Sequence, residues 1–497
     1  MELQTALARL EEIQRTCHAY THALSVLNYD GATVAPEKSA RGRAETGAVL
    51  GGVVYDLLTG SELQGILEFL AARPAELTAE QRRQVELLKE SFDQTACIPR
   101  EEYLAYTRLQ TEADAVWHRA KPANDFAAFA PCLEQLIDYN RRFALYYKPD
   151  RDPYETMLDQ FEKGVTVEGL DGFFGMLRER LVPLIRRIGE AAPIDDSLLH
   201  VEFPIEKQRL LSDRVMELMT IDRTRCAIGE TLHPFTDGFN TDDVRITTNY
   251  RLNDFTDSMF SVIHEGGHAL YELGVDPAYD GTVLGGGASL GVHESQSRFF
   301  ENIVGRSRGF CRRLLPLAKE LCPALAPMTD EQFYRAINRS HPSLIRTAAD
   351  ELTYPLHIMV RYELEKQLIA GTLPVAGLPA AWNRLYRDYL GVEVPDDEHG
   401  CLQDSHWSGG AFGYFPSYAL GSAYAAQYLH VMKRDIDFDA AVAGDLSPIV
   451  GWLGQHIHRF GRLYDPAALV EKACGAPFDP QYYIDYLTAK YSELYGL

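Results

Sequence analysis

The sequence predicts a mainly helical, all-α protein with one short β segment. Apolar side chains recur at three- and four-residue spacing along most of the 497 residues, which is the pattern of amphipathic helices. Prolines fall between these periodic segments, where they end helices. Only residues 243–250 alternate β-branched with polar side chains, as a strand does. No long linker or repeat divides the chain, so we expect a single domain over residues 1–497, cleft into two lobes.

The expected helices follow in chain order. The first covers residues 2–27, with apolar side chains at Leu3, Leu7, Leu10, Ile13, Cys17, Tyr20 and Leu24. The same spacing predicts helices over residues 79–94, 100–120 and 125–146. A further helix should cover residues 167–189, and Pro183 should kink or divide it.

The expected strand, Asp243–Tyr250, follows a turn-rich run at Thr236–Asn240. A lone strand pair in a helical protein often lies beside a cleft. Its free edge can hold an extended peptide by strand addition. A small structural sheet explains the same pattern equally well.

Composition restricts the classes of partner. The chain has 48 basic and 71 acidic residues, a net charge of −23, which argues against nucleic-acid or anionic-membrane binding. No stretch is apolar enough for a membrane-spanning helix, and the N-terminus lacks the apolar region of a secretory signal. The eight cysteines form no CxxC pair. Free thiols in a reducing cytoplasm are therefore expected.

A helix expected between Asp254 and Gly274 carries the HExxH sequence His264-Glu265-Gly266-Gly267-His268. Two histidines four residues apart lie on one helical face with Cβ atoms about 5–6 Å apart, so their imidazoles can share one metal ion. The intervening glutamate lies to one side, where it can reach a water molecule. Two core histidines are the alternative. Each glycine should cost the helix about 1 kcal/mol, so the pair predicts a close backbone approach.

A third ligand is expected on the next helix, after the loop Gly285–Gly287. There Glu294 would return towards His268 if the two helices form a hairpin. A His₂Glu set with one open position is the hydrolytic arrangement of zinc enzymes. Glu301, two turns further on, is either a partner of a ligand histidine or a solvated surface glutamate.

Further residues suit a peptidase site. Arg346 opens an expected long helix and has the donor fork that binds a carboxylate. An Arg346–Asp350 surface pair is the simpler reading of that spacing. The stretch Gly400–Gly421 is rich in glycine and tyrosine and contains His406, Tyr414 and Tyr418. Tyrosine and histidine donors near a metal can stabilise an oxyanion.

Five motifs in order complete the pattern. They are Asp243–Thr247 (DxRxT), His264–His268 (HExxH), His293–Gln296 (HESQ), Ile345–Asp350 (IRxxAD) and Gly400–Trp407 (GxxQDxHW). With these motifs the chain resembles the carboxypeptidase Taq family of metallocarboxypeptidases. The resemblance implies a helical fold like that of neurolysin and angiotensin-converting enzymes, with a deep groove between two lobes and a three-stranded sheet beside it. It also implies a cytoplasmic homodimer that releases C-terminal amino acids from peptides with broad specificity.

The resemblance also implies roles for individual residues. The metal would be one divalent ion per chain, zinc as the first expectation and cobalt as the alternative. The implied roles are metal ligation by His264, His268 and Glu294, general-base catalysis by Glu265, carboxylate binding by Arg346, substrate binding by Arg245 and His406, and oxyanion stabilisation by Tyr418 with His406, with Tyr414 as second choice. We expect Arg346 and Arg245 to bind the same group of the substrate, the free C-terminal carboxylate. An endo-oligopeptidase or dipeptidyl carboxypeptidase on the same fold, and a catalytically silent peptide-binding protein, are the alternatives.

Overall fold

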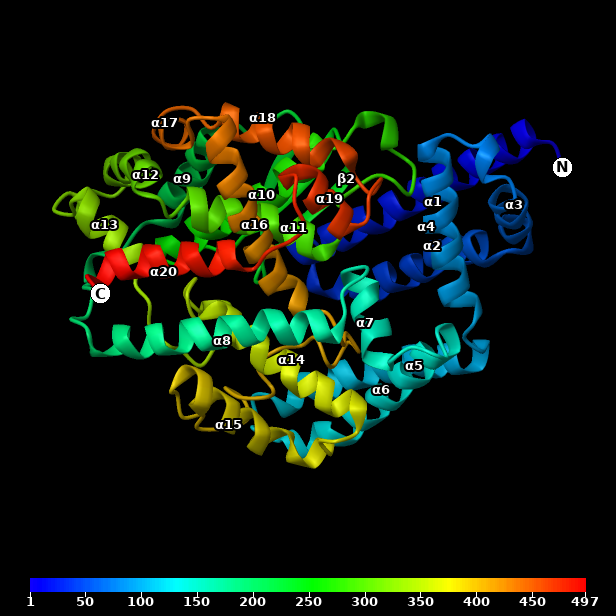
Figure 1. Ribbon diagram of the computed structural model, residues 1–497, viewed down its shortest axis with the longest axis horizontal. Helices are drawn as coiled ribbons and strands as arrows, with labels where there is room; N and C mark the ends of the chain where they lie inside the picture. Colours follow the sequence, from blue (N-terminus) through cyan, green and yellow to red (C-terminus); the bar gives the residue numbers. More distant parts are fainter.

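The computed structural model describes residues 1–497 and shows a helical molecule with one small sheet (Figure 1). The two chain termini lie at opposite ends of the long axis of the view. The α-helices are α1 (Leu3–Thr33), α2 (Ala40–Thr59), α3 (Ser61–Ala71), α4 (Ala79–Ala96), α5 (Arg100–Ala120), α6 (Phe126–Tyr147), α7 (Pro153–Phe161), α8 (Val167–Glu190), α9 (Ile205–Leu218), α10 (Phe255–Gly274), α11 (Leu290–Arg298), α12 (Arg308–Leu321), α13 (Asp330–Ile337), α14 (Tyr354–Ala370), α15 (Leu378–Leu390), α16 (Pro416–Asp435), α17 (Phe438–Ala443), α18 (Ser447–His456), α19 (Pro466–Cys474) and α20 (Gln481–Tyr495). No helix combines the length and the apolar character that crossing a bilayer requires.

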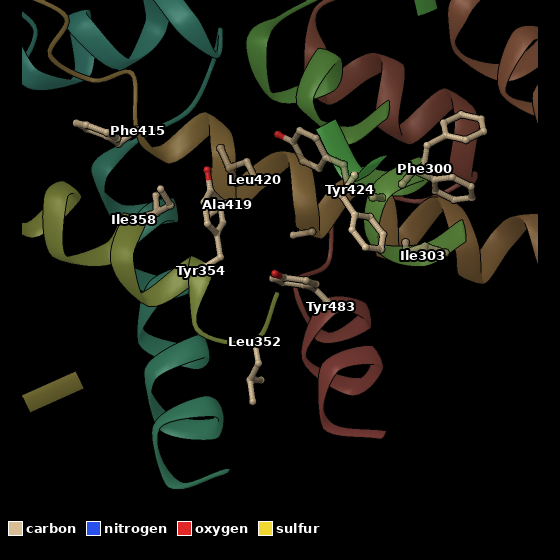
Figure 2. Packing of buried hydrophobic residues seen from close by; sticks show 14 of the residues in the cluster. Phe300, Ile303, Leu352, Tyr354, Ile358, Phe415, Ala419, Leu420, Tyr424 and Tyr483 are labelled. Atoms are coloured by element: carbon tan, nitrogen blue, oxygen red, sulfur yellow. The ribbon is translucent and has the colours of Figure 1, made fainter. Parts of the chain in front are cut away.

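Two apolar cores hold the helices together. The larger one takes buried side chains from Leu109 to Leu494. A second core of 11 buried residues lies between α1, α3 and α4, the helices at the right of Figure 1. Figure 2 shows part of the larger core, where α16 contributes Leu420 and Tyr424 and the π-helical turn after α11 contributes Phe300 and Ile303. Helix α16 is therefore central to the packing around α11.

The sheet contains three strands, β1 (Cys226–Glu230), β2 (Thr236–Asn240) and β3 (Asp243–Thr248). β3 lies in the middle, parallel to β1 and antiparallel to β2. β3 is paired on both sides and has no free edge of its own, so the outer edges of the sheet belong to β1 and β2. The sequence predicts a turn over residues 236–240, but these residues form strand β2. Their backbone groups pair with β3, and this pairing overrides side chains that favour turns. The small sheet lies against α10.

The helix expectations hold in position, with differences at the ends. α1 continues to Thr33 rather than ending near residue 27. α8 is not divided at Pro183, because its buried face continues on both sides of the proline through Leu181 and Ile185. The expected helices over residues 79–94, 100–120 and 125–146 are α4, α5 and α6.

The segment Ile345–Asp350 does not open a long helix, so that expectation is wrong. It forms a single 3₁₀ turn, Arg346–Ala348, and α14 begins at Tyr354. The carboxylate of Asp350 accepts hydrogen bonds from the backbone N–H groups of Leu352 and Thr353, at 3.0 and 3.1 Å. An aspartate that takes up backbone donors in this way favours a turn over a helix.

Candidate metal centre and active site

Helices α10 and α11 pack against each other and carry the metal motif. The side chain of Asp254 accepts a hydrogen bond from the N–H of Asp257 and caps α10, which ends at Gly274 as its sequence predicts. A Cβ atom at Gly267 would lie 2.6 Å from the carbonyl oxygen of Gln296 on α11. This contact confirms the close backbone approach expected at the paired glycines. It brings the two helices near enough for their side chains to share one site.

Three donor groups converge between these helices. The nitrogen and oxygen donors of His264, His268 and Glu294 all lie within 4.8 Å of one another. Oε2 of Glu294 lies 3.7 Å from Nε2 of His264 and 3.5 Å from Nε2 of His268. Donors about 2.1 Å from a tetrahedral metal ion are about 3.4 Å apart. The spacing of the donors therefore fits a single metal ion.

The other polar atoms of these side chains have partners of their own. Nδ1 of His264 lies 2.9 Å from Oε2 of Glu301, whose side chain is 14% exposed, so Glu301 partners a candidate ligand and is not a solvated surface residue. Nε of Arg298 donates to Oε1 of Glu294 at 2.7 Å, and its Nη1 donates to Glu301 at 3.1 Å. Oε2 of Glu294 accepts a hydrogen bond of 3.1 Å from the hydroxyl of Ser297 and also faces the two Nε2 atoms, so all three donor atoms remain directed at one point.

The electrostatics of the site suit a cation. Burial lowers the pKa of His268 to about 4, so this imidazole is neutral near pH 7, as a ligand must be. Burial opposes ionisation of Glu294, but Arg298 and His264 hold the pKa of its carboxyl well below the ordinary value. Burial opposes the charged form of His264, but the carboxylates of Glu294 and Glu301 outweigh burial and raise the pKa of this imidazole, so a metal ion at its Nε2 would have to displace a proton. Two imidazole nitrogens with one carboxylate form the donor set of hydrolytic zinc sites. The residues present therefore fit a divalent metal.

Glu265 lies on the same helix with its carboxylate directed at the sheet. Its Oε2 accepts a hydrogen bond of 2.6 Å from the hydroxyl of Thr236 on β2. The side chain is only 7% exposed, and burial raises the pKa of this carboxyl. A buried carboxylate with a raised pKa is a better proton acceptor than an exposed one.

Arg346 belongs to a buried charge cluster. Its Nε and Nη2 donate to Oδ1 of Asp404 at 2.9 and 2.8 Å, and Nη1 donates to the hydroxyl of Tyr354 at 3.2 Å. Arg361 donates from Nε to Oδ2 of the same carboxylate at 2.7 Å. Arg346 therefore does not form a surface pair with Asp350. One carboxylate between two guanidinium groups leaves one positive charge in excess.

A cavity of about 830 Å³ joins these groups. Its lining includes the candidate ligands His264 and Glu294 together with Glu265, Arg346 and Tyr418. His406 lies directly behind, with its Nε2 3.3 Å from the hydroxyl of Tyr418. The two rings of Tyr414 and Tyr418 are 5.3 Å apart. Of these two tyrosines, only Tyr418 lines the cavity.

His406 and Tyr418 are both held in their uncharged forms. Burial lowers the pKa of His406 to about 4. Burial also raises the pKa of Tyr418 well above its ordinary value. The phenol therefore keeps its proton near neutral pH and can donate a hydrogen bond into the cavity.

Arg245 is not brought to this cavity. It lies on β3, where Nε and Nη2 donate to Asp243 at 3.0 and 2.9 Å. Its guanidinium lies over the rings of Phe239 and Tyr29, 4.6 and 5.3 Å from their centroids. Arg245 thus lies outside the cavity that Arg346 lines, although we expected both residues to bind the C-terminal carboxylate.

Several site residues have no signal in the sequence. Thr236 lies in a run that looks like a turn, and Arg298 and Tyr354 occupy ordinary helical positions. Arg298 lies 4.1 Å above the ring of Tyr354, and both line the cavity. Only the Arg298 spacing, four residues after Glu294 and three before Glu301, hints at its role.

Comparison with known proteins decides the family. The family model of the carboxypeptidase Taq (M32) metallopeptidases matches residues 9–491. The chain belongs to this family. It is therefore a metallocarboxypeptidase, a metal-dependent peptide hydrolase. The expected family and the expected helical fold with a small sheet are confirmed.

Relatives match along their whole length. Carboxypeptidase 1 of Bacillus subtilis is 40% identical over 501 residues, and thermostable carboxypeptidase 1 of Thermus thermophilus is 36% identical over 511 residues, each covering 100% of both chains. The crystal structure of the M32 carboxypeptidase from Deinococcus radiodurans R1 superposes with a TM-score of 0.96 at 37% identity, covering 99% of this chain and 100% of that one. The metallocarboxypeptidase is thus similar to these relatives in both sequence and fold.

Proposed function

We propose that this metallocarboxypeptidase removes single residues from the free C-terminus of peptides, with broad specificity. The observation that carries the proposal is one cavity lined at one place by the His264 and Glu294 donors and at another by Arg346, whose cluster with Asp404 and Arg361 has one positive charge in excess. If the carbonyl of the last peptide bond lies beside the donors, only one residue remains between that bond and the terminal carboxylate. A bidentate guanidinium is the side chain best suited to that carboxylate.

The reaction follows from the residues around the donor set. His264, His268 and Glu294 would hold one divalent ion, zinc first and cobalt as the alternative, because two imidazoles and a carboxylate suit both. When bound, that ion would supply Lewis-acid chemistry at the scissile carbonyl and would lower the pKa of the attacking water. Glu265 takes the proton from this water and delivers it to the departing amine.

Tyr418 supplies the second stabilising donor. Its hydroxyl donates a hydrogen bond to the oxyanion that develops on the former carbonyl oxygen. His406, 3.3 Å from that hydroxyl, orients it. Arg346 binds the terminal carboxylate throughout, with Asp404 fixing the plane of the guanidinium. Arg245 remains a proposed substrate-binding residue for parts of the peptide outside this cavity.

Broad specificity is proposed from the size of the cavity. A volume of about 830 Å³ lies in the upper part of the range for ligand pockets, so it admits both small and large side chains. We also propose that residues 1–497 act as one peptidase domain, that the chain is a homodimer, and that it works in the cytoplasm. All eight cysteines are unpaired, which suits a reducing compartment.

An assay of paired peptides tests the proposal. One peptide carries a free C-terminus, and its twin carries an amide. The last residue should be released only from the peptide with the free C-terminus. This activity should be lost with a chelator and should return with zinc or cobalt. Cleavage of both peptides at internal bonds would indicate an endopeptidase, and release of a dipeptide would indicate a dipeptidyl carboxypeptidase.

A further inference from the structure

The two candidate histidine ligands are held by different partners. His264 contacts the carboxylate of Glu301 directly through Nδ1. His268 instead places its Nδ1 2.6 Å from Nδ1 of His293, the first residue of the HESQ motif. Nε2 of His293 in turn lies 2.6 Å from Oε1 of Glu272. His268 is thus linked through His293 to the carboxylate of Glu272.

Only one arrangement of hydrogens satisfies this chain of contacts with neutral imidazoles. The carboxylate of Glu272 accepts and does not donate, so Nε2 of His293 carries the hydrogen. Nδ1 of a neutral His293 is then an acceptor, and the hydrogen between the rings belongs to Nδ1 of His268. The lone pair of His268 is thereby confined to Nε2, the atom that faces Glu294 at 3.5 Å.

The surroundings of His293 are shaped for this ring. A Cβ atom at Gly287 would lie 2.5 Å from Cδ2 of His293 and 2.9 Å from Cε1 of Tyr271. The rings of Tyr271 and His293 have centroids 5.1 Å apart. The hydroxyl of Tyr271 accepts a hydrogen bond of 3.0 Å from the N–H of Ala288, which fixes the loop. The His293 imidazole is therefore packed between His268 and Tyr271 and has little freedom to turn.

The contacts also join two helices. Glu272 follows His268 by four residues, so both lie on one face of α10. His293 reaches them from α11, one residue before Glu294. The same contacts that orient the imidazole of His268 thus set its position relative to the carboxylate of Glu294.

We propose that His293 and Glu272 are positioning residues that fix the tautomer and the ring plane of His268 for the metal. The proposal rests on the proposed function only in that the chain binds a divalent metal. His293 itself makes no contact with the metal or the substrate. Outer partners of this kind raise metal affinity by about 10–100-fold. The HESQ motif then contributes both a ligand, Glu294, and the support of another.

Metal affinity tests this directly and needs no activity assay. Zinc and cobalt dissociation constants are measured for the full chain by competition with a chromophoric chelator. His293→Leu removes both contacts and should weaken binding by about 10–100-fold. Glu272→Gln, which removes the charge, should show a smaller loss. His293→Gln should restore most of the affinity, because its amide can accept from His268 and donate to Glu272.

A matched control separates positioning from packing. His458 is buried and also packs against Tyr271, with ring centroids 5.1 Å apart, and its Nε2 contacts Gln296. His458→Leu should leave the metal dissociation constant within about threefold of wild type. An equal loss in His458→Leu and His293→Leu would overturn the proposal, as would wild-type affinity in His293→Leu. If His293→Leu does not fold, as judged by the melting temperature of the metal-free protein, Glu272→Gln decides: unchanged affinity overturns the proposal. Failure of the wild-type chain to bind metal would instead contradict the proposed function.

Discussion

The hydroxyl of Thr236 donates a hydrogen bond of 2.6 Å to the carboxylate of Glu265, and so links strand β2 to helix α10. The same hydroxyl lies 3.0 Å from the carbonyl oxygen of Glu265. Strand β2 therefore fixes the direction of the proposed general base. Through this contact the small sheet supports the proposed general base.

Thr236→Val should lower kcat while metal content stays the same. The substitution keeps the shape of the side chain and removes a hydrogen bond to a charged group, which is worth about 1.5–3 kcal/mol. A loss of about tenfold in kcat is expected. Thr241→Val, which removes a hydroxyl bonded to Asp280 at the far end of β2, is the control. Steady-state kinetics that give equal rates for both variants would show that the contact with Glu265 has no catalytic role.

Arg346→Lys should raise KM for peptides with a free C-terminus by at least about tenfold, with a smaller change in kcat. Lysine keeps the positive charge but lacks the planar fork that matches a carboxylate. Arg339→Lys is the control, since Arg339 lines the same cavity but pairs with Asp196 at 3.0 Å. An unchanged KM in Arg346→Lys removes this residue from carboxylate binding.

Tyr418→Phe should lower kcat by about 10²–10³-fold, the usual effect of losing one oxyanion donor. Tyr414→Phe should cost far less, because Tyr414 does not line the cavity. KM and metal content should change little in either variant. The reverse order of the two losses would assign the oxyanion role to Tyr414.

The free energy of unfolding should depend on pH through Glu162, which follows α7 and whose buried carboxyl contacts the first turn of α11. This carboxyl accepts a hydrogen bond of 2.8 Å from the N–H of Gly291 and one of 3.1 Å from Tyr424, yet burial raises its pKa to about 7. A pKa raised on folding means that the protonated form is favoured, so the stabilisation is complete below pH 4 to 5 and is lost as the pH rises through about 7.

Glu162→Gln removes this titration and keeps both hydrogen bonds, since the amide can donate to the hydroxyl of Tyr424. The free energy of unfolding of the variant relative to wild type should increase by about 2 kcal/mol between pH 5 and pH 8. Denaturant unfolding at both pH values measures the difference. A difference that does not change with pH would show that Glu162 does not titrate in this range.

The sequence predicted the cluster of candidate metal donors because the spacing of these residues is local. His264 and His268 share one helical turn, and Glu294 needs only a helix hairpin to join them. The paired glycines, Gly266 and Gly267, predicted the close contact that brings the hairpin together, which a Cβ at Gly267 would prevent. The helical fold followed from the same periodicity.

Contacts between distant segments could not be predicted in this way. Arg346 looked like the partner of Asp350, four residues on, but pairs with Asp404, which is 58 residues away. β1 and β2 form because β3 offers them backbone partners, a tertiary effect that overrides the turn residues of 236–240. Thr236 became a partner of Glu265 only through that pairing. Likewise, nothing in the sequence indicated that Arg245 would lie outside the cavity that Arg346 lines.

The proposed reaction depends above all on Glu265 as the base. Bound zinc or cobalt and the release of C-terminal residues are measured on the same sample of Glu265→Gln. Wild-type metal content and a fall in kcat of about 10²–10⁴-fold are expected, because the amide cannot accept the proton of the attacking water. Wild-type turnover with a full complement of metal would contradict this role.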